Sequence, residues 1–420
     1  MRLLVVVNAF HPDRGGGSAV FSDLCYGLAQ QGLDVTVRCP YPYYPEWRDK
    51  SGKNGWSIWR YEDCNVKVER FGLFIPRDPS SLWQRVLFEG TFLLSLLRAL
   101  PKDGRFNAVM VYCPLVSAIA YAWLVKLFFH VPIWLNIQDI SADAAAATKI
   151  ARFGLVIKIL SAIERFLFNR ADVWSTISPV MADRLLPMRR NQQSILFMPN
   201  WVDATMAEAL RVHRNGRPSP ERGQEPLLLY AGNVGAKQNL LEFCKFLHES
   251  DVPFHFRIFG SGAKFEEISN WLHMADDARF MVGPFLDVAE LAKELIAADF
   301  YVITERQGVG GSFFPSKMVT GMLSGIPILA VCDVESPLGR EMHEAEPGPR
   351  FEWKRLNGVV ELLQNFKRDK EDVATWRRNA INRAACYDRN KIITRFRKNI
   401  TSLVKGESLI GWEEIGNRGG

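Results

Sequence analysis

Short apolar runs of strand length alternate with helical stretches along most of the chain. The first run, LLVVV at residues 3–7, is followed by a glycine-bearing loop, the helical stretch SAVFSDLCYGLAQQ and a second apolar run, LDVTVRC. Brief runs of this kind, bounded by turn residues and separated by a helix, are typical of βαβ units with parallel strands. The N-terminal segment therefore predicts the start of an α/β domain.

The same order begins again about 225 residues later. The run LLLYA leads into the loop GNVGAKQ, the helical stretch NLLEFCKFLHES and the run FHFRIFG. Further runs follow in both halves: NAVMVY, PIWLNI and VWSTIS in the first, and RFMVG, FYVIT and PILAV in the second. Runs that alternate with helices in this way predict an α/β fold of two doubly wound, Rossmann-like domains.

Length and composition agree with two domains. The 420 residues exceed what one hydrophobic core usually serves, and 48% of them are apolar. Residues 204–226 are polar and rich in Pro, Gly and Arg, which is typical of an exposed linker. We therefore predict an N-terminal domain at 1–203, a linker at 204–226 and a second domain at 227–371.

Ligands of doubly wound sheets bind beyond the carboxyl ends of the strands, where loops lead into helix N-termini. Two lysines occur in such loops. Lys317 belongs to a Pro-Ser-Lys that opens a short helix, and Lys237 stands where the helix after LLLYA is expected to start. A cation near a helix N-terminus is mildly unfavourable, but a bound diphosphate reverses the sign of that interaction. The pair predicts a phosphate site, and the alternative is two solvated surface lysines.

Other residues of this edge carry weaker signals. Glu305 ends the run FYVIT and could accept hydrogen bonds from sugar hydroxyls, although a solvent-facing loop charge is an equal alternative. Asp287 has the spacing of a capping box with Glu290 and is left out of the site. The histidines show no metal-ligand pattern, and no catalytic triad can be inferred from the spacing. We expect neither a metal nor another cofactor.

The composition limits the class of partner and the compartment. The formal charge of +6 fits an anionic partner, which could be a phosphorylated metabolite, an acidic membrane surface or a nucleic acid. The seven cysteines form no C-x-x-C pair, so we expect a reducing, cytoplasmic location. The glycines at 15–17 lack the G-x-G-x-x-G spacing, which disfavours an NAD-dependent enzyme.

Two segments, 83–100 and 150–170, are apolar around most of a helix. We predict mostly buried helices there, and the alternative is docking of a basic, apolar patch onto anionic lipid. No segment is predicted to cross a bilayer.

Several stretches together resemble the retaining nucleotide-sugar glycosyltransferases of family 4 and, among them, the bacterial exopolysaccharide enzymes of the colanic-acid-biosynthesis type. They are PYPYYPEWR (40–48), VERFGLFIPRDPSS (68–81), LNIQDISADAA (135–145), ADVWSTIS (171–178), FMPNWVD (197–203), YAGNVGAKQNL (230–240) and FFPSK with SGIPILAV. The resemblance implies a GT-B fold, in which the two domains face a central cleft. It also implies that helices within 372–405 return to the N-terminal domain, ahead of a tail at 406–420.

The resemblance implies a role for each matching residue. Lys237 and Lys317 become the cations of the donor diphosphate, and Asp139 and Glu305 complete the candidate catalytic set. The other donor-binding candidates are Gly16, Gly17, Gly232, Asn233, Gly235, Gln238, Gly260, Gly262, Phe285 and Ser316. His11 and Gln138 are placed on the acceptor and sugar side, where Gln138 replaces a histidine of the relatives. Relatives also carry two glutamates at positions that are Ser312 and Thr320 here.

The implied activity is that of a hexosyltransferase-type glycosyltransferase of class EC 2.4. It would move a sugar from a nucleotide diphosphate sugar to a hydroxyl of a lipid-linked saccharide, with retention, in extracellular or capsular polysaccharide biosynthesis. The expected partners are the donor, the acceptor and the inner face of an anionic membrane, with no nucleic acid. The alternative is a non-catalytic protein of the same fold that binds a nucleotide sugar or assembly partners.

Overall fold

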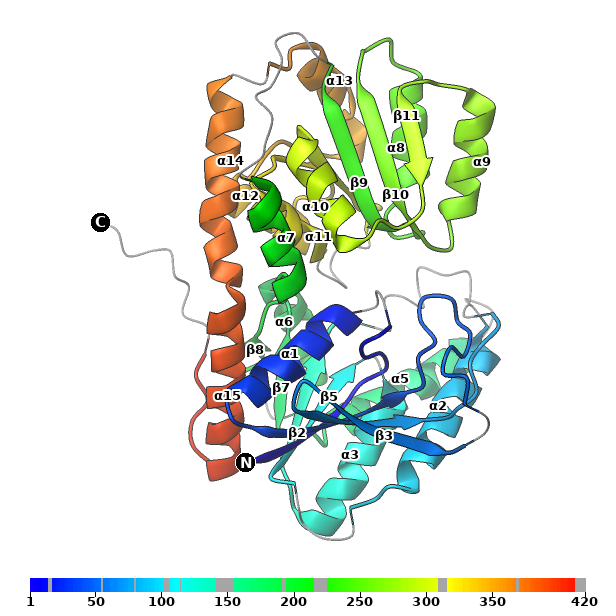
Figure 1. Ribbon diagram of the computed structural model, residues 1–420, viewed down its shortest axis with the longest axis vertical. Helices are drawn as coiled ribbons and strands as arrows, with labels where there is room; N and C mark the ends of the chain where they lie inside the picture. The colour runs from blue at the N-terminus through cyan, green and yellow to red at the C-terminus, as the bar shows by residue number, and fades with distance from the viewer. Residues whose placement is uncertain are drawn as a thin grey trace, which may run out of the picture. The chain divides into compact units, whose positions relative to one another are not determined.

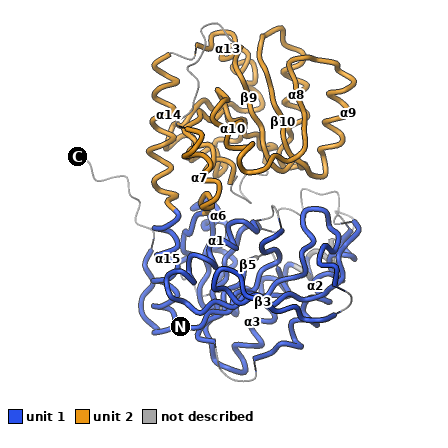
Figure 2. Tube along the Cα trace, viewed as in Figure 1, with its two compact units in different colours: residues 1–199, 389–420 blue, residues 200–388 orange. Residues whose placement is uncertain are grey.

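The computed structural model divides the chain into two compact units. It describes residues 1–13, 17–53, 56–78, 81–101, 106–113, 115–140, 154–190, 194–214, 225–308, 316–367 and 370–411. The first unit comprises Met1–Pro199 and Arg389–Gly420, and the second comprises Asn200–Asp388 (Figure 2). Each unit is an α/β domain, as the alternation of apolar runs and helices predicts (Figure 1).

The first unit is built on a sheet in the strand order β3-β4-β2-β1-β5-β6-β7-β8. Its strands are β1 (Arg2–Val6), β2 (Asp34–Pro40), β3 (Ile58–Asp63), β4 (Val66–Phe71), β5 (Ala108–Cys113), β6 (Ile133–Ile137), β7 (Val173–Thr176) and β8 (Leu196–Phe197). Only the β3–β4 pair is antiparallel among the pairs of this described sheet. The apolar run at residues 3–6 forms the central strand β1, where both faces of the sheet are buried.

Helices connect these strands. They are α1 (Ser18–Gln30), α2 (Leu82–Leu97), α3 (Val116–Phe129), α5 (Gly154–Phe168), α6 (Pro179–Leu185), the 3₁₀ turn η2 (Leu186–Met188) and α15 (Arg389–Lys405). The last of them, α15, packs against α1. Nε and Nη2 of Arg389 donate to the Asp23 carboxylate at 2.6 and 2.8 Å, and the Ile393 side chain lies against Gly27. The end of the chain is thereby joined to the first unit.

The second unit has a fully parallel sheet in the order β11-β10-β9-β12-β13-β14. Its strands are β9 (Leu227–Asn233), β10 (His255–Ser261), β11 (Phe280–Gly283), β12 (Phe300–Thr304), β13 (Ile328–Val331) and β14 (Arg350–Phe351). Its helices are α7 (Ala204–Arg214), α8 (Leu240–His248), α9 (Phe265–Ala275), α10 (Val288–Ala297), α11 (Ser316–Ser324), α12 (Pro337–Ala345), α13 (Asn357–Gln364) and α14 (Glu371–Ala384), with 3₁₀ turns η4 (Trp353–Arg355) and η5 (Ala385–Tyr387). The predicted capping box at the start of α10 is present, because Asp287 accepts a hydrogen bond from the Glu290 backbone and Glu290 accepts one in return.

The unit boundaries differ from the predicted domain boundaries at two places. Residues 204–214 form α7 rather than a linker, and α7 packs against α10 in the second unit. Its buried Met206 and Leu210 stand one turn apart, a short apolar stripe that the polar surroundings hide in the sequence. The helices predicted to return to the first domain also divide, because α14 packs against α11 and only the residues from Arg389 onward join the first unit.

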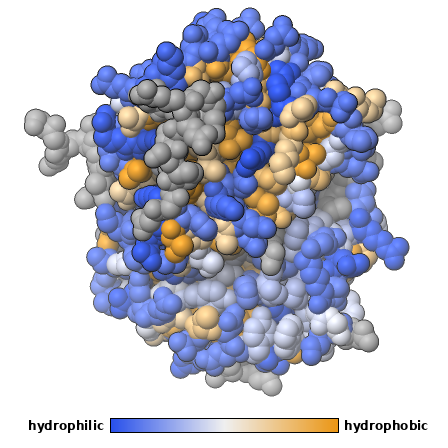
Figure 3. Space-filling model, turned by 45° about the horizontal axis from the view of Figure 1, so that its top comes forward, coloured by the Kyte–Doolittle hydropathy of each residue, from blue (hydrophilic) through white to orange (hydrophobic). Residues whose placement is uncertain are grey.

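One face of the molecule is mainly hydrophilic (Figure 3). On the face drawn in Figure 3, hydrophobic residues form patches between larger hydrophilic areas. Within the described residues, no helix is both long enough and apolar enough to span a bilayer.

Candidate functional site

The chain order of the second sheet reverses at β9, which lies between β10 and β12. At such a point neighbouring connections leave in opposite directions, and this opens a space for a ligand beyond the carboxyl ends of the strands. Lys237 lies in the turn that follows β9, and Lys317 is the second residue of α11, the helix that follows β12. Both lysines therefore come from loops that flank the reversal. Lys317 starts its helix as predicted, whereas Lys237 precedes α8 and lies outside its first turn.

The Lys317 ammonium group lies over an aromatic ring. Its Nζ is 3.6 Å from the centroid of the Tyr230 ring and 3.4 Å from the backbone oxygen of Asn233. Within the described part of the chain it has no acidic partner. Burial lowers the pKa of Lys317 to about 7. A cation held in this way, without a carboxylate, is suited to accept an anionic ligand.

Two paired glycines, Gly232 and Gly260, allow the ends of β9 and β10 to approach each other closely. A Cβ on Gly260 would lie 2.0 Å from the backbone oxygen of Gly232, so no side chain fits there. Gly232 has φ of +126°, and a Cβ on it would lie 2.7 Å from Cε of Lys317. Gly262 directly follows β10, with φ of +141°. The absence of these side chains leaves room for the lysine and brings backbone groups to the ligand edge.

The remaining donor-binding candidates of the second unit lie in different loops or at the ends of different elements. Gln238 holds the loop, since its Oε1 accepts a hydrogen bond of 2.9 Å from the Gly235 backbone. Asn233 and Ser316 are exposed at the ends of β9 and α11. Phe285 follows β11, with 48% of its side chain exposed. The loop candidates therefore lie along one edge of one sheet, as the strand order requires.

Glu305 differs from its predicted environment. It ends β12 as expected, but it is 1% exposed and is neither a solvent-facing charge nor open to a sugar hydroxyl. Burial raises the pKa of Glu305 to about 8. A carboxyl group with such a pKa is mostly protonated at neutral pH.

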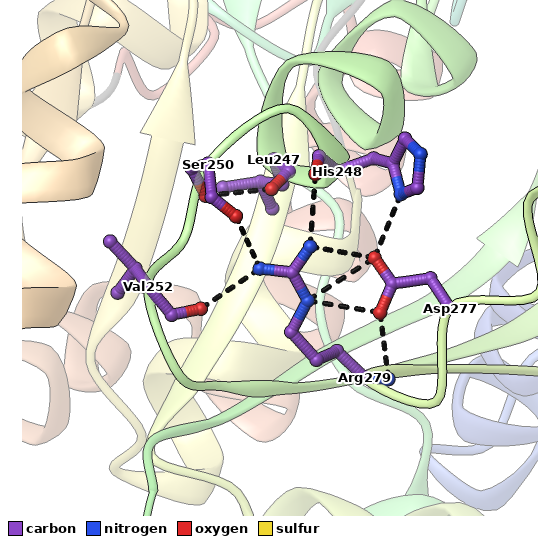
Figure 4. Close-up of polar contacts among 6 residues, drawn as sticks. All are labelled: Leu247, His248, Ser250, Val252, Asp277 and Arg279. Atoms are coloured by element: carbon purple, nitrogen blue, oxygen red, sulfur yellow. Dashed lines mark hydrogen bonds and ion pairs between the residues drawn. The ribbon is translucent and has the colours of Figure 1, made fainter.

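A cluster of charged side chains lies at the amino ends of β10 and β11, away from the two lysines. Arg279 donates to Asp277 and to the backbone oxygens of His248, Ser250 and Val252, and Asp277 also contacts Nδ1 of His248 (Figure 4). These residues precede β10 and β11. The cluster ties the end of α8 to both strands, and its guanidinium group is fully paired, unlike the lysine over Tyr230.

The candidates of the first unit lie in loops after β1 and β6. Gly17 caps α1 with φ of +84°, and Nδ1 of His11 lies 3.6 Å from Asp63. Gln138 donates to Asn136, and Asp139 follows it, half-buried. Gly16 and Ser312 lie outside the described residues.

Comparison with known proteins identifies relatives that are named as glycosyltransferases. Residues 15–201 match a family model described as a glycosyl transferase 4-like domain. The protein of Escherichia coli K12 named colanic acid biosynthesis glycosyl transferase WcaI is 28% identical over 364 residues, which cover 83% of this chain and 87% of that protein. The glycosyltransferase WbjE of Pseudomonas aeruginosa is 27% identical over 199 residues, 46% of this chain and 48% of WbjE.

Solved structures agree on the fold. Sucrose-phosphate synthase from Thermosynechococcus elongatus superposes with a TM-score of 0.74 at 14% identity, over 97% of this chain and all of that chain. Anabaena HepE in complex with UDP-glucose gives a TM-score of 0.66 at 12% identity, over 96% of this chain and all of HepE. The chain is a glycosyltransferase with the GT-B fold.

Some neighbours of the site in this glycosyltransferase were missed by the sequence analysis. Tyr230 is buried within β9 and supplies the ring under Lys317. Asp333 and Ser336 follow β13 at the same edge as Glu305. The carboxyl-end rule, applied to the run PILAV as well, would have selected residues 332–336, whereas nothing in the sequence marks Tyr230. Within the described residues, no group of three or more His, Cys, Asp and Glu side chains could hold a metal ion.

Proposed function

We propose that this glycosyltransferase moves a sugar from a nucleotide diphosphate sugar to a hydroxyl of a lipid-linked saccharide, with retention, in extracellular or capsular polysaccharide biosynthesis. The observation that carries the donor class is Lys317 at the start of α11, a lysine that has no acidic partner among the described residues. Support comes from HepE, whose structures contain UDP and UDP-glucose, and from the name of WcaI.

The chemistry follows from charge on the leaving group. The bond between the anomeric carbon and the phosphate oxygen breaks, and its electron pair stays on the diphosphate. Lys237, Lys317 and the amides at the start of α11 would stabilise that charge more in the transition state than in the bound donor. The acceptor oxygen bonds to the anomeric carbon, and its proton passes to the departing phosphate. The exposed ring of Phe285 would stack on the nucleoside base.

A ligand panel tests the donor class. We expect UDP, GDP or TDP, or one of their sugars, to raise the melting temperature of the wild-type protein by several degrees, because a ligand that binds only the folded state stabilises it by mass action. Release of the matching nucleoside diphosphate in the presence of a lipid-linked acceptor would then show transfer. Stabilisation without turnover would contradict the proposed acceptor, and no stabilisation by any of these ligands would contradict the proposed donor class.

We infer that α5 brings the first unit to an anionic membrane. The prediction of a mostly buried helix at 150–170 is wrong for its outer face, because Ile159, Ile163 and Phe166 are 51%, 45% and 39% exposed. Lys158 and Arg165 are exposed beside them. Apolar side chains at i, i+4 and i+7 with flanking bases are typical of a helix that lies in a membrane interface.

Changing Ile163 to glutamate is expected to weaken binding to phosphatidylglycerol vesicles by about tenfold, because an apolar contact is lost and a repelled charge is added. Co-sedimentation with vesicles measures the effect. Met274→Glu changes a residue of the second unit that is 84% exposed and serves as the control. Equal binding by the two variants would exclude α5 from the contact.

A further inference from the structure

The fold buries the carboxyl group of Glu305. The residue is 1% exposed, and neither Oε1 nor Oε2 forms a hydrogen bond of normal geometry with the described residues. Burying a charge without a partner is strongly unfavourable. Such a group is therefore either neutral or serves a function.

The groups around this carboxyl come from the adjoining strands and helix. Cys332 and Asp333 follow β13, Ser336 caps α12, and Arg350 on β14 acts electrostatically on the neighbouring Cys332. Among the described residues, Asp333 is the acidic side chain that raises the pKa of Glu305 further, while the Ser336 hydroxyl opposes the rise. A carboxylate at this place would therefore be repelled rather than paired.

The backbone beside Glu305 connects the Lys237 turn to the segment that follows β13. The Arg306 amide donates to the backbone oxygen of Lys237 at 2.7 Å, and the Gly308 amide donates to Asp333 at 2.7 Å. On the other side, Nε1 of Trp353 donates to the backbone oxygen of Glu305 at 2.7 Å. Three hydrogen bonds thus hold residues 305–308, the segment that begins with the buried Glu305.

We propose that Glu305 is a positioning residue for the diphosphate site, whose buried carboxyl group holds residues 305–308 in the conformation that supports the Lys237 turn. The proposal rests on the proposed function, because it names the part of the fold that keeps one of the two cations in place. Glu305 acts through the backbone and does not touch the ligand.

The position is stable only while the carboxyl group is neutral. Because the pKa of Glu305 is about 8, the group keeps its proton at neutral pH and fits its apolar surroundings. Loss of the proton places a charge beside Asp333, and no cation of the described residues compensates it, which favours movement of the side chain toward water. Residues 305–308 then move with it, and the hydrogen bond from Arg306 to Lys237 is lost.

Glu305→Gln tests the idea, because glutamine has the same shape and cannot ionise. Affinity is measured by calorimetry with whichever of UDP, GDP and TDP the wild-type protein binds. We expect equal affinities within about twofold near pH 6.5, and wild-type binding that is weaker than that of the variant by about tenfold near pH 9. Titration of Lys317 is common to both proteins, so the ratio isolates Glu305. A ratio that does not change with pH would overturn the proposal.

A measurement without ligand separates this inference from the proposed function. The folded protein retains a proton on Glu305 that the unfolded chain releases above its ordinary pKa of 4.5. The melting temperature of the wild type should therefore fall relative to Glu305→Gln as the pH rises from about 4.5 to about 8, and the difference should then stay constant. Glu335→Gln removes an exposed carboxylate of the same loop region and should show no such trend. Parallel curves for wild type and Glu305→Gln would show a role of shape alone and contradict the inference, even if nucleotides bind.

Discussion

Replacing Lys317 by methionine is expected to weaken binding of a nucleotide diphosphate sugar by about 100-fold, since hydrogen bonds from a charged group to a ligand contribute up to about 3 kcal/mol. Methionine keeps most of the side-chain length over the Tyr230 ring and removes the charge, so the loss reports the ammonium group rather than packing. Because that charge also stabilises the leaving diphosphate, turnover should fall at least as far as binding. Calorimetry with the donor found in the ligand panel measures the first effect, and release of the nucleoside diphosphate measures the second.

The same substitution should change the pH dependence of binding. Because the pKa of Lys317 is about 7, the free wild-type protein carries this charge below that pH and loses it above. Donor affinity should therefore fall with rising pH above about 7 in the wild type and lack this component in Lys317→Met. Lys293→Met removes an exposed lysine of α10 and should leave both affinity and pH profile unchanged. A donor affinity that Lys317→Met leaves intact would exclude this lysine from the site.

Stability should change in the opposite direction. The folded protein resists a proton on Lys317 that the unfolded chain accepts below its ordinary pKa of 10.5, so the wild type loses stability as the pH falls from about 10.5 to about 7. Methionine at this position has no such cost. The unliganded variant should therefore melt at a higher temperature than the wild type near pH 7, with a difference that shrinks toward high pH. A buried lysine that lowers the stability of the folded protein is consistent with a binding role, because residues that serve binding often reduce stability.

The fold was predictable from the sequence because its signals are local. The runs LLVVV and LLLYA predict buried parallel strands. Because loops after parallel strands meet at the carboxyl edge of the sheet, Lys237 and Lys317 are predicted to lie at one edge. The capping box at Asp287 was also read correctly, because both of its hydrogen bonds join residues three apart in the chain. In each case the deciding interaction lies within one element or one strand–helix connection.

The environment of single side chains could not be predicted in the same way. Glu305 has the sequence position of a ligand-facing carboxylate, but its burial depends on Cys332 and Ser336, which reach it only through the pairing of β12 with β13. Tyr230 is one of many buried aromatics until α11 brings Lys317 over its ring. The helix α7 was missed because its two buried residues stand in a segment whose overall composition is polar. Tertiary contacts determine these three environments, and such contacts cannot be predicted from a single sequence by local patterns.

Changing Gly232 to alanine is expected to impair the site through two physical effects. Its φ of +126° is rarely adopted by residues with a side chain, and that strain costs about 1–3 kcal/mol of folding free energy. The added Cβ would also lie 2.7 Å from Cε of Lys317 and force the lysine away from the Tyr230 ring. Donor affinity should therefore fall by about tenfold or more, in addition to a lower melting temperature.

Two further variants separate these effects. Gly32→Ala introduces the same kind of strain at φ of +90°, in the first unit and with nothing within 4 Å of the new Cβ, so it should lower the melting temperature and leave donor affinity unchanged. In the Lys317→Ala background the clash is gone, and Gly232→Ala should cause little additional loss of affinity, which a double-mutant cycle measures as coupling. If the two losses of affinity simply added, Gly232 would act on the ligand through its own backbone rather than by leaving room for Lys317.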